Sequence, residues 1–194
     1  MGCDIHLYVE RKIDDQWVQQ FNSKQEEKWK KYWYDGRSYF LFSLLAGVRG
    51  PFDPFVEPKG LPQDMSEELT EEWKGWKDDG HTPSHYTVSE LLEHRDKPMT
   101  FTGFVGVKNY KLFKKTGKPD DWFYDLYKKK VLSNQEMERI MNLMAFWDGD
   151  DPYTEIAWEG TAADIASNFW EGLAEIQKLD PNPENIRCVF WFDN

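Results

Sequence analysis

The chain begins and ends with short segments whose hydrophobic pattern is that of β-strands. In "MGCDIHLYVE" apolar and polar residues alternate, so one strand face is apolar and the other carries Asp4, His6, Tyr8 and Glu10. The closing "IRCVFWFDN" has three aromatic residues in succession, which predicts an interior strand covered on both faces. We expect both strands to lie in one sheet, with Cys3 and Cys188 reduced on its core side.

The pattern between these strands predicts several further elements. "KIDDQWVQQF" predicts a hairpin turn at Asp14–Asp15 and a second strand, and "SYFLFSLLAGVRG" predicts the most buried helix, capped by Ser38. Capping-box spacing occurs at Asp64 with Glu67, Thr87 with Glu90, and Ser133 with Glu136. Helices are predicted over 66–76, 88–97, 108–118, 120–130, 135–147 and 161–179, strands over 99–107 and 153–160, and loops over 51–65 and 77–86.

These elements predict the α+β class. We expect one domain over residues 1–194, with a small mixed β-sheet that includes the N- and C-terminal strands and several helices packed on it. The strand–helix–strand succession over residues 153–194 favours a parallel, right-handed crossover.

Composition restricts the classes of partner. A net charge of −11 argues against a general nucleic-acid binder and against binding to an anionic membrane surface. No run approaches 18 apolar residues, so no membrane span is predicted. With two cysteines and no signal-peptide pattern, we expect a reduced, cytoplasmic protein.

Histidine and aspartate positions suggest a metal site. Asp4 and His6 share a strand face, and Asp79, His81 and His85 share one short segment. A divalent ion such as Zn²⁺ or Mn²⁺, held by Asp4, His6 and His81, could activate water for attack on an ester or phosphoester. The alternative is that these side chains make structural hydrogen bonds only.

Aromatic and basic residues suggest a second kind of site, a ligand pocket without catalysis. Tyr8, Tyr39 and Trp191 could stack on a planar base. Arg37, Arg49 and Lys59 lie at helix ends or in the proline-rich segment, where they could hold phosphate. The alternative places the aromatic residues in the core and the basic residues on the surface.

Five segments spread over the whole chain carry a resemblance. "MGCDIHLYVE", "GRSYFLF…LAGVR", "EPKGLPQDMS", "DGHTPSH" and "VFWFDN" resemble an uncharacterised protein family encoded in bacteriophage genomes. The resemblance implies an accessory phage protein that acts in the cytoplasm of the infected bacterium. It implies no catalytic residue.

Three functions follow as hypotheses. The first is a phage accessory protein, for example in counter-defence, that binds a nucleotide-like small molecule. Asp4 and His6 would line the pocket, and the 79–85 loop would close over it. The aromatic and basic residues named above would surround the ligand. The second is a metal-dependent (phospho)ester hydrolase that uses the same Asp/His cluster. The third is an acidic protein that blocks a basic host protein. The sequence leaves the ligand and any homo-oligomer open.

Overall fold

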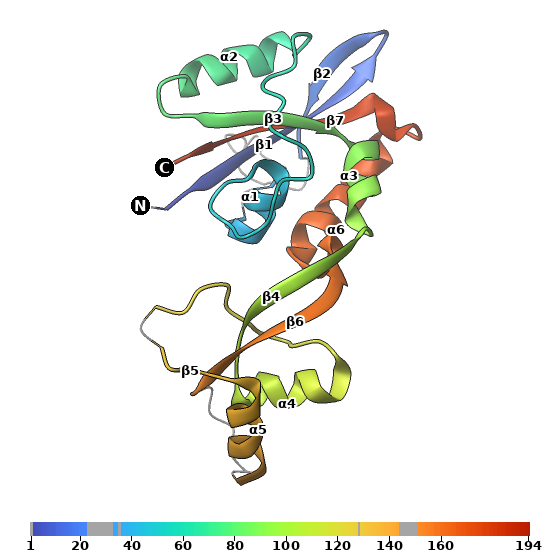
Figure 1. Cartoon of the computed structure of the whole chain (residues 1–194). Coiled ribbons are helices and arrows are strands. Elements are labelled where there is room, and N and C mark those ends of the chain that lie inside the picture. The colour runs from blue at the N-terminus through green and yellow to red at the C-terminus, as the bar shows by residue number, and fades with distance from the viewer. Residues whose placement is uncertain (1, 23–32, 35, 128, 144–150) are drawn as a thin grey trace. The chain divides into compact units, whose positions relative to one another are not determined.

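The computed structural model describes residues 2–22, 33–34, 36–127, 129–143 and 151–194. The chain divides into two compact units (Figure 1). Unit 1 comprises Met1–Lys97 and Ala162–Asn194, and unit 2 comprises Pro98–Thr161. Each unit has its own β-sheet, and each is described by itself below.

Unit 1 is organised around a four-stranded antiparallel sheet. Its strand order is β2 (Gln16–Gln20), β1 (Asp4–Ile13), β7 (Ile186–Asp193), β3 (His81–Thr87). The first and last strands of the chain therefore lie side by side, with Asp4 opposite Asp193 and Arg11 opposite Ile186 (Figure 1). Cys3 and Cys188 are both buried free thiols, as the alternation predicts.

The β1–β2 hairpin turns where the sequence predicts it. Asp14 and Asp15 have φ angles of 48° and 63°, in the left-handed region that aspartate tolerates better than most residues. Two consecutive left-handed residues are what a tight hairpin turn requires, because their twist matches that of the strands.

Helices cover both faces of this sheet. Helix α1 (Tyr39–Ala46) is capped by Ser38, ends at the left-handed Gly47, and has every side chain from Leu41 to Ala46 buried. It packs on the apolar face of β1 and β7, where the Phe42 and Phe192 rings lie 5.1 Å apart. Helix α2 (Glu67–Trp76) covers the other face (Figure 1). Its buried Leu69 packs with Tyr8, Val189 and Trp191.

Two further helices complete unit 1. Helix α3 (Val88–Arg95) follows β3 directly, and its first turn has the predicted capping box of Thr87 and Glu90. Helix α6 (Ser167–Ile176) buries Phe169, Trp170 and Leu173 and precedes β7. Single turns of 3₁₀ helix lie at Ala162–Asp164, Gln177–Leu179 and Pro183–Asn185.

Unit 2 contains a smaller, mixed sheet. Strand β4 (Pro98–Gly106) pairs antiparallel with β6 (Tyr153–Thr161), and β5 (Val131–Leu132) pairs parallel with the start of β6. Helices α4 (Val107–Thr116) and α5 (Asn134–Leu143) pack beside them. Gly103 lets the Trp122 ring approach β4, since an added Cβ would lie 2.3 Å from that ring. Trp122 meets the Phe101 and Trp158 rings there.

The predicted α+β class and the shared sheet of the two terminal strands are confirmed, because the described residues form six α-helices and two sheets. The predicted parallel crossover is wrong: β6 and β7 belong to different sheets. Parallel pairing within the described ranges occurs between β5 and β6 of unit 2, whereas the sheet of the termini is antiparallel throughout.

Several local predictions are also wrong. Residues 77–86 were predicted as a loop but contain most of β3. Pro83 is tolerated there because β3 is an edge strand and its register with β7 is irregular between His81 and Ser84. Within residues 120–130, the described positions form bends and one β-bridge at Phe123 rather than a helix. The cap of α2 is Ser66, not Asp64, and α6 begins at Ser167 rather than near Thr161. None of the described helices combines the length and apolar character needed to cross a membrane.

Candidate functional site

The polar face of β1 is a second buried layer beneath α2. His6 is 7% exposed, and its ring centroid lies 3.9 Å from that of Trp76. Tyr8 is fully buried, stacks on Trp191 at 4.8 Å, and donates a hydrogen bond of 3.2 Å to Glu72 of α2. Tyr8 and Trp191 are therefore core residues here, and α2 occupies the space in which a stacked base was predicted.

Asp4 and His6 each have a partner within unit 1. Arg37 donates two hydrogen bonds to the Asp4 carboxylate, of 2.8 and 2.5 Å, and holds the pKa of Asp4 below its usual range. His6 Nε2 lies 3.5 Å from a carboxylate oxygen of Asp193. Burial lowers the pKa of His6, and the Asp193 carboxylate opposes that shift without reversing it. Asp4 and His6 are thus part of a structural network at the end of the sheet.

His81 lies on the opposite face of the sheet from His6. His81 is opposite Phe192 in the register, and its ring stacks on Phe192 at 6.0 Å, on the side that α1 covers. Asp79 is exposed in the turn after α2, with its backbone N–H bonded to Trp76. The predicted closure of this loop over Asp4 and His6 is wrong. Across the described ranges of the chain, no three His, Cys, Asp or Glu side chains converge as a metal-binding group, the predicted Asp4–His6–His81 set included.

The groups predicted to hold phosphate bind other parts of the protein. Arg49 donates to the Asn194 side chain at 2.8 Å, and the Lys59 ammonium bonds both oxygens of Glu90 at 2.9 Å. His85 bonds the Gly60 carbonyl at 2.9 Å, and the Tyr39 hydroxyl accepts from the Cys3 N–H at 3.2 Å. These contacts fix the termini and the proline-rich segment, so the structure does not assemble these residues into one nucleotide pocket.

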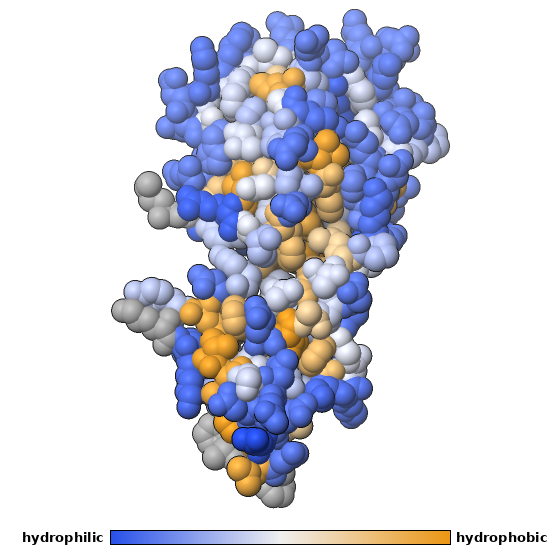
Figure 2. Space-filling view, in the orientation of Figure 1, coloured by the Kyte–Doolittle hydropathy of each residue, from blue (hydrophilic) through white to orange (hydrophobic). Residues whose placement is uncertain are grey.

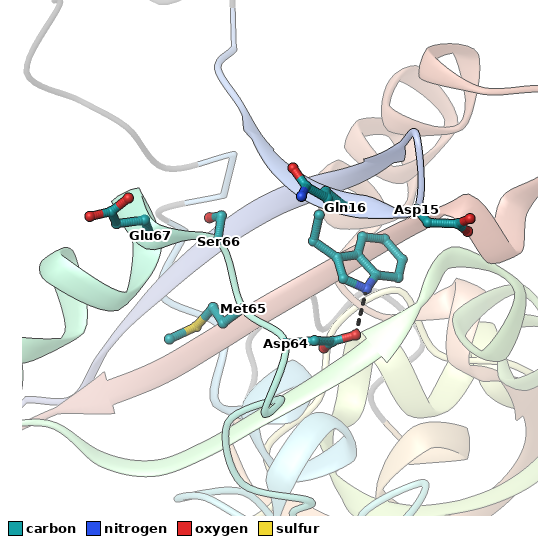
Figure 3. A pocket seen from close by; sticks show the side chains of 7 residues that line it. Asp15, Gln16, Asp64, Met65, Ser66 and Glu67 are labelled. Atoms are coloured by element: carbon teal, nitrogen blue, oxygen red, sulfur yellow. Dashed lines mark hydrogen bonds between the residues drawn. The ribbon is translucent and has the colours of Figure 1, made fainter.

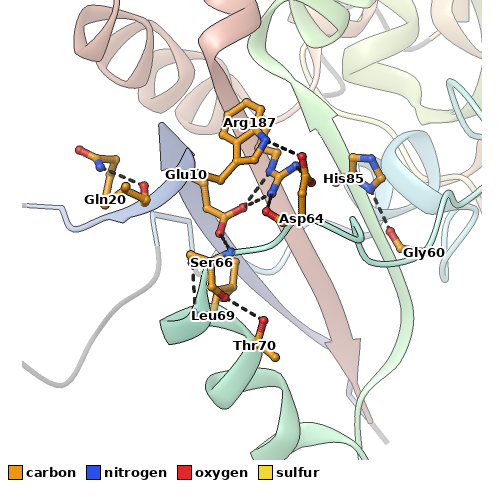
Figure 4. Close-up of polar contacts among 11 residues, drawn as sticks. Glu10, Gln20, Gly60, Asp64, Ser66, Leu69, Thr70, His85 and Arg187 are labelled. Atoms are coloured by element: carbon orange, nitrogen blue, oxygen red, sulfur yellow. Dashed lines mark hydrogen bonds and ion pairs between the residues drawn. The ribbon is translucent and has the colours of Figure 1, made fainter. Parts of the chain in front are cut away.

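A buried arginine organises the other end of the same sheet face. Arg187 of β7 is 4% exposed and lies opposite Glu10 of β1, which is fully buried. Its Nε donates to Glu10 at 2.8 Å, while Nη1 and Nη2 donate to the side chain and backbone carbonyl of Asp64 at 2.7 and 3.1 Å (Figure 4). The second Glu10 oxygen accepts the Ser66 N–H at 2.8 Å. A strand-to-strand ion pair therefore anchors the segment that starts α2.

Trp17 of β2 completes this network. The Arg187 guanidinium lies 4.0 Å from the centroid of the Trp17 ring, and the indole N–H donates to Asp64 at 2.9 Å. The hydrogen bond from Arg187 lowers the pKa of Asp64, although that side chain is 68% exposed. Asp64 is thus held ionised at the surface by a buried cation beneath it.

A pocket of about 290 Å³ opens beside Trp17 and Asp64 (Figure 3). We call it the Trp17–Asp64 pocket. Its lining residues come from the β1–β2 hairpin and from the segment that enters α2: Asp15, Gln16, Trp17, Asp64, Met65, Ser66 and Glu67. All of the charged residues in this lining are acidic.

Sequence reasoning missed this pocket. One signal was present: Arg187 is the only charged residue of "IRCVFWF", and burying an unpaired charge in a strand is costly. That signal predicts a buried carboxylate partner, and Glu10 on the polar face of β1 was a candidate. Asp64 could not be assigned, because its position depends on the path of the proline-rich segment.

Unit 2 contains a second pocket, of about 540 Å³. Its described lining residues are Lys129, Lys130, Ile140, Asp151 and Pro152. They come from the segments that precede β5 and β6 and from α5. We call it the Lys129–Lys130 pocket.

Comparisons of the chain with models of protein families, with curated proteins and with solved structures found no match.

Proposed function

We propose that the protein acts by binding, and that the Trp17–Asp64 pocket of unit 1 takes a cationic group, an ammonium or a guanidinium. One observation carries the proposal: the pocket combines an aromatic wall, Trp17, with three carboxylates, Asp15, Asp64 and Glu67. This is the chemistry that recognises organic cations and basic side chains.

The charge distribution supports a cation. Unit 1 carries 15 Lys and Arg residues against 25 Asp and Glu residues, a net charge of −10. An acidic surface raises the local concentration of cations and accelerates their encounter with the pocket. Because Arg187 holds Asp64 in its ionised form, the pocket keeps this charge at neutral pH and below.

The size of the pocket supports a small group. Small-molecule sites commonly measure about 300–1,000 Å³, so a volume of about 290 Å³ suits one amine or guanidinium rather than a nucleotide. Asp64 is paired with Arg187 and Asp15 with Lys12, but the described lining itself contains no cation that could hold a phosphate. The predicted acidic blocker of a host protein uses this same chemistry, with a lysine or arginine side chain as the ligand.

The resemblance to a phage-encoded family supplies the context of the proposal. An accessory phage protein in the host cytoplasm would meet polyamines as well as basic proteins. The two sources share one recognition chemistry, and a titration can distinguish them.

The test is a nuclear magnetic resonance titration that follows the Trp17 indole N–H, which lies in the pocket wall. Agmatine and spermidine represent free cations, and an arginine-containing peptide represents a protein side chain. We expect saturable shifts of this signal, and an affinity about tenfold weaker in the double variant Asp15→Asn/Glu67→Gln. Neither of these exposed side chains contacts Arg187.

The matched control is Glu68→Gln/Asp79→Asn, which also removes two negative charges, but from exposed positions of unit 1 outside the pocket. Its affinity should stay within about twofold of the unmodified protein. Equal weakening in both double variants would show general charge attraction rather than a pocket, and the absence of any saturable shift would overturn the proposal.

A further inference from the structure

The Lys129–Lys130 pocket of unit 2 differs in chemistry from the pocket of unit 1. Its described lining consists of two lysines, one carboxylate (Asp151) and two apolar side chains, Ile140 and Pro152. A pocket with an excess of lysines in its described lining is unusual in a protein whose net charge is −11. Its lysines therefore call for a specific explanation.

The frame of this pocket is fixed by the parallel pairing of β5 and β6. The Tyr153 N–H donates to the Lys130 carbonyl at 3.1 Å, which ties the segment before β5 to the start of β6. The Thr154 hydroxyl contacts both the Leu132 carbonyl, at 2.9 Å, and the Asn134 side chain, at 2.8 Å. Asn134 begins α5, so these bonds hold the start of α5 to the sheet.

The charged residues in the described lining of this pocket are mostly lysines. Lys129 places its ammonium 5.8 Å from the centroid of the Tyr153 ring, a contact that leaves the charge in place. Hydrogen bonds from Ser133 are the main cause that lowers the pKa of Glu136, and the charges of Lys130 and Arg139 lower it further, so Lys130 shares that carboxylate with a hydroxyl donor and a second cation. Asp151 is the one acidic side chain among the described lining residues. Lysines thus outnumber carboxylates in the described lining by two to one.

Unit 2 as a whole also lacks the acidic excess of unit 1. It carries 9 Lys and Arg residues against 10 Asp and Glu residues, a net charge of −1. Five lysines lie between residues 108 and 118, with no acidic residue among them. The charges of unit 2 itself therefore give an approaching anion almost no net repulsion.

We infer that the Lys129–Lys130 pocket binds a phosphate-bearing small molecule of mononucleotide size. The lysines supply point charges for the phosphate. Ile140 and Pro152 supply an apolar surface for a planar body. The volume of about 540 Å³ lies within the range of such sites, whereas that of the unit 1 pocket does not. This site is independent of the function proposed for unit 1.

The test is isothermal titration calorimetry of the full chain at about 0.1 M salt, where general charge attraction is largely screened. The probes are AMP, inorganic phosphate and adenosine. We expect AMP to bind with one-to-one stoichiometry, inorganic phosphate to bind about tenfold more weakly, and adenosine to bind about tenfold more weakly or not at all. Adenosine binding as tightly as AMP would overturn recognition of the phosphate.

Variants then locate the site. Lys129→Ala/Lys130→Ala should weaken AMP binding at least about tenfold, and Lys129→Arg/Lys130→Arg should retain most of it, because charge is kept. Lys108→Ala/Lys115→Ala removes two exposed lysines of α4 and should change affinity by less than about twofold. Equal loss in the α4 variant, or failure of all three probes to bind, would overturn the inference.

Discussion

The two units of this chain use aromatic and charged residues in opposite ways. In unit 1 a four-stranded sheet is covered by α1 and α2 on its two faces. Most aromatic and charged residues along β1 and β7 are therefore buried in internal contacts. In unit 2 three strands support less burial, and Tyr127 and Leu143 are 79% and 84% exposed. The face shown in Figure 2 is largely hydrophilic, with apolar patches on both units. A residue type that suggests ligand binding is therefore weak evidence where a sheet has a cover on both sides.

The two pockets extend this contrast. Unit 1 holds nearly all of the net charge and has an acidic pocket beside Trp17, whereas unit 2 is close to neutral and has a pocket lined by two lysines. In unit 1 the acidic pocket rests on a buried cation, Arg187, that keeps its central carboxylate in place. The mutations below test whether the buried polar layer of unit 1 is structural, as this comparison requires.

The largest effect is expected at Arg187. Arg187→Met leaves the fully buried Glu10 carboxylate without its cation, which should cost about 3–5 kcal/mol in the free energy of unfolding. The measurement is a denaturant titration followed by circular dichroism. The double variant Glu10→Met/Arg187→Met removes both charges and should regain most of the loss, because a buried pair can be replaced by apolar side chains of similar volume. A double variant no more stable than Arg187→Met would contradict the ion-pair explanation.

A pair of leucines compares burial in the two units directly. Leu44 of α1 is 1% exposed and Leu143 of α5 is 84% exposed. Leu44→Ala should cost about 2–5 kcal/mol in the same titration, since it leaves a cavity in the buried surroundings of α1. Leu143→Ala should change stability by less than about 0.5 kcal/mol. A loss below about 1 kcal/mol for Leu44→Ala would place α1 at the periphery of unit 1.

Local sequence signals predicted those elements whose causes are local. Alternation identified β1, the run of apolar residues after Ser38 identified α1, and the spacing of Thr87 and Glu90 identified the start of α3. β3 was missed because "HTPSHYT" has little strand character of its own. It becomes a strand because β7 offers a partner along its length, and that partner lies about 100 positions further along the sequence.

The candidate sites depended on the same distant information. Alternation showed correctly that Asp4, His6, Tyr8 and Glu10 share a face, but it could not show that α2 covers that face. The expected partners were therefore sought in the 79–85 segment, which the register of β3 places with His81 on the other side of the sheet. Strand pairing and the path of the proline-rich segment decided the site, and neither has a local sequence signature.

The smallest expected effect concerns pH and separates the units most cleanly, because all four histidines lie in unit 1. Burial holds the pKa of folded His6 below its ordinary value of 6.5. As pH falls through 6.5, the unfolded chain takes up a proton that folded His6 does not, so stability is lost in that direction. The Asp4 carboxylate does not contribute here, since its pKa lies below its ordinary value of 3.8.

We therefore expect backbone amides of β1 and β7 to lose protection from hydrogen exchange between pH 7.5 and 5.5, after correction for intrinsic rates, while those of β4 and β6 do not. His6→Gln should remove much of this pH dependence, because glutamine does not titrate. Burial lowers the pKa of His94 as well, so His94→Gln is the matched control and measures the remainder. If the protection lost by β1 and β7 is the same in His6→Gln as in the unmodified protein, His6 is not held neutral by its burial under Trp76. The Asp193 carboxylate, 3.5 Å away, would then offset the effect of burial.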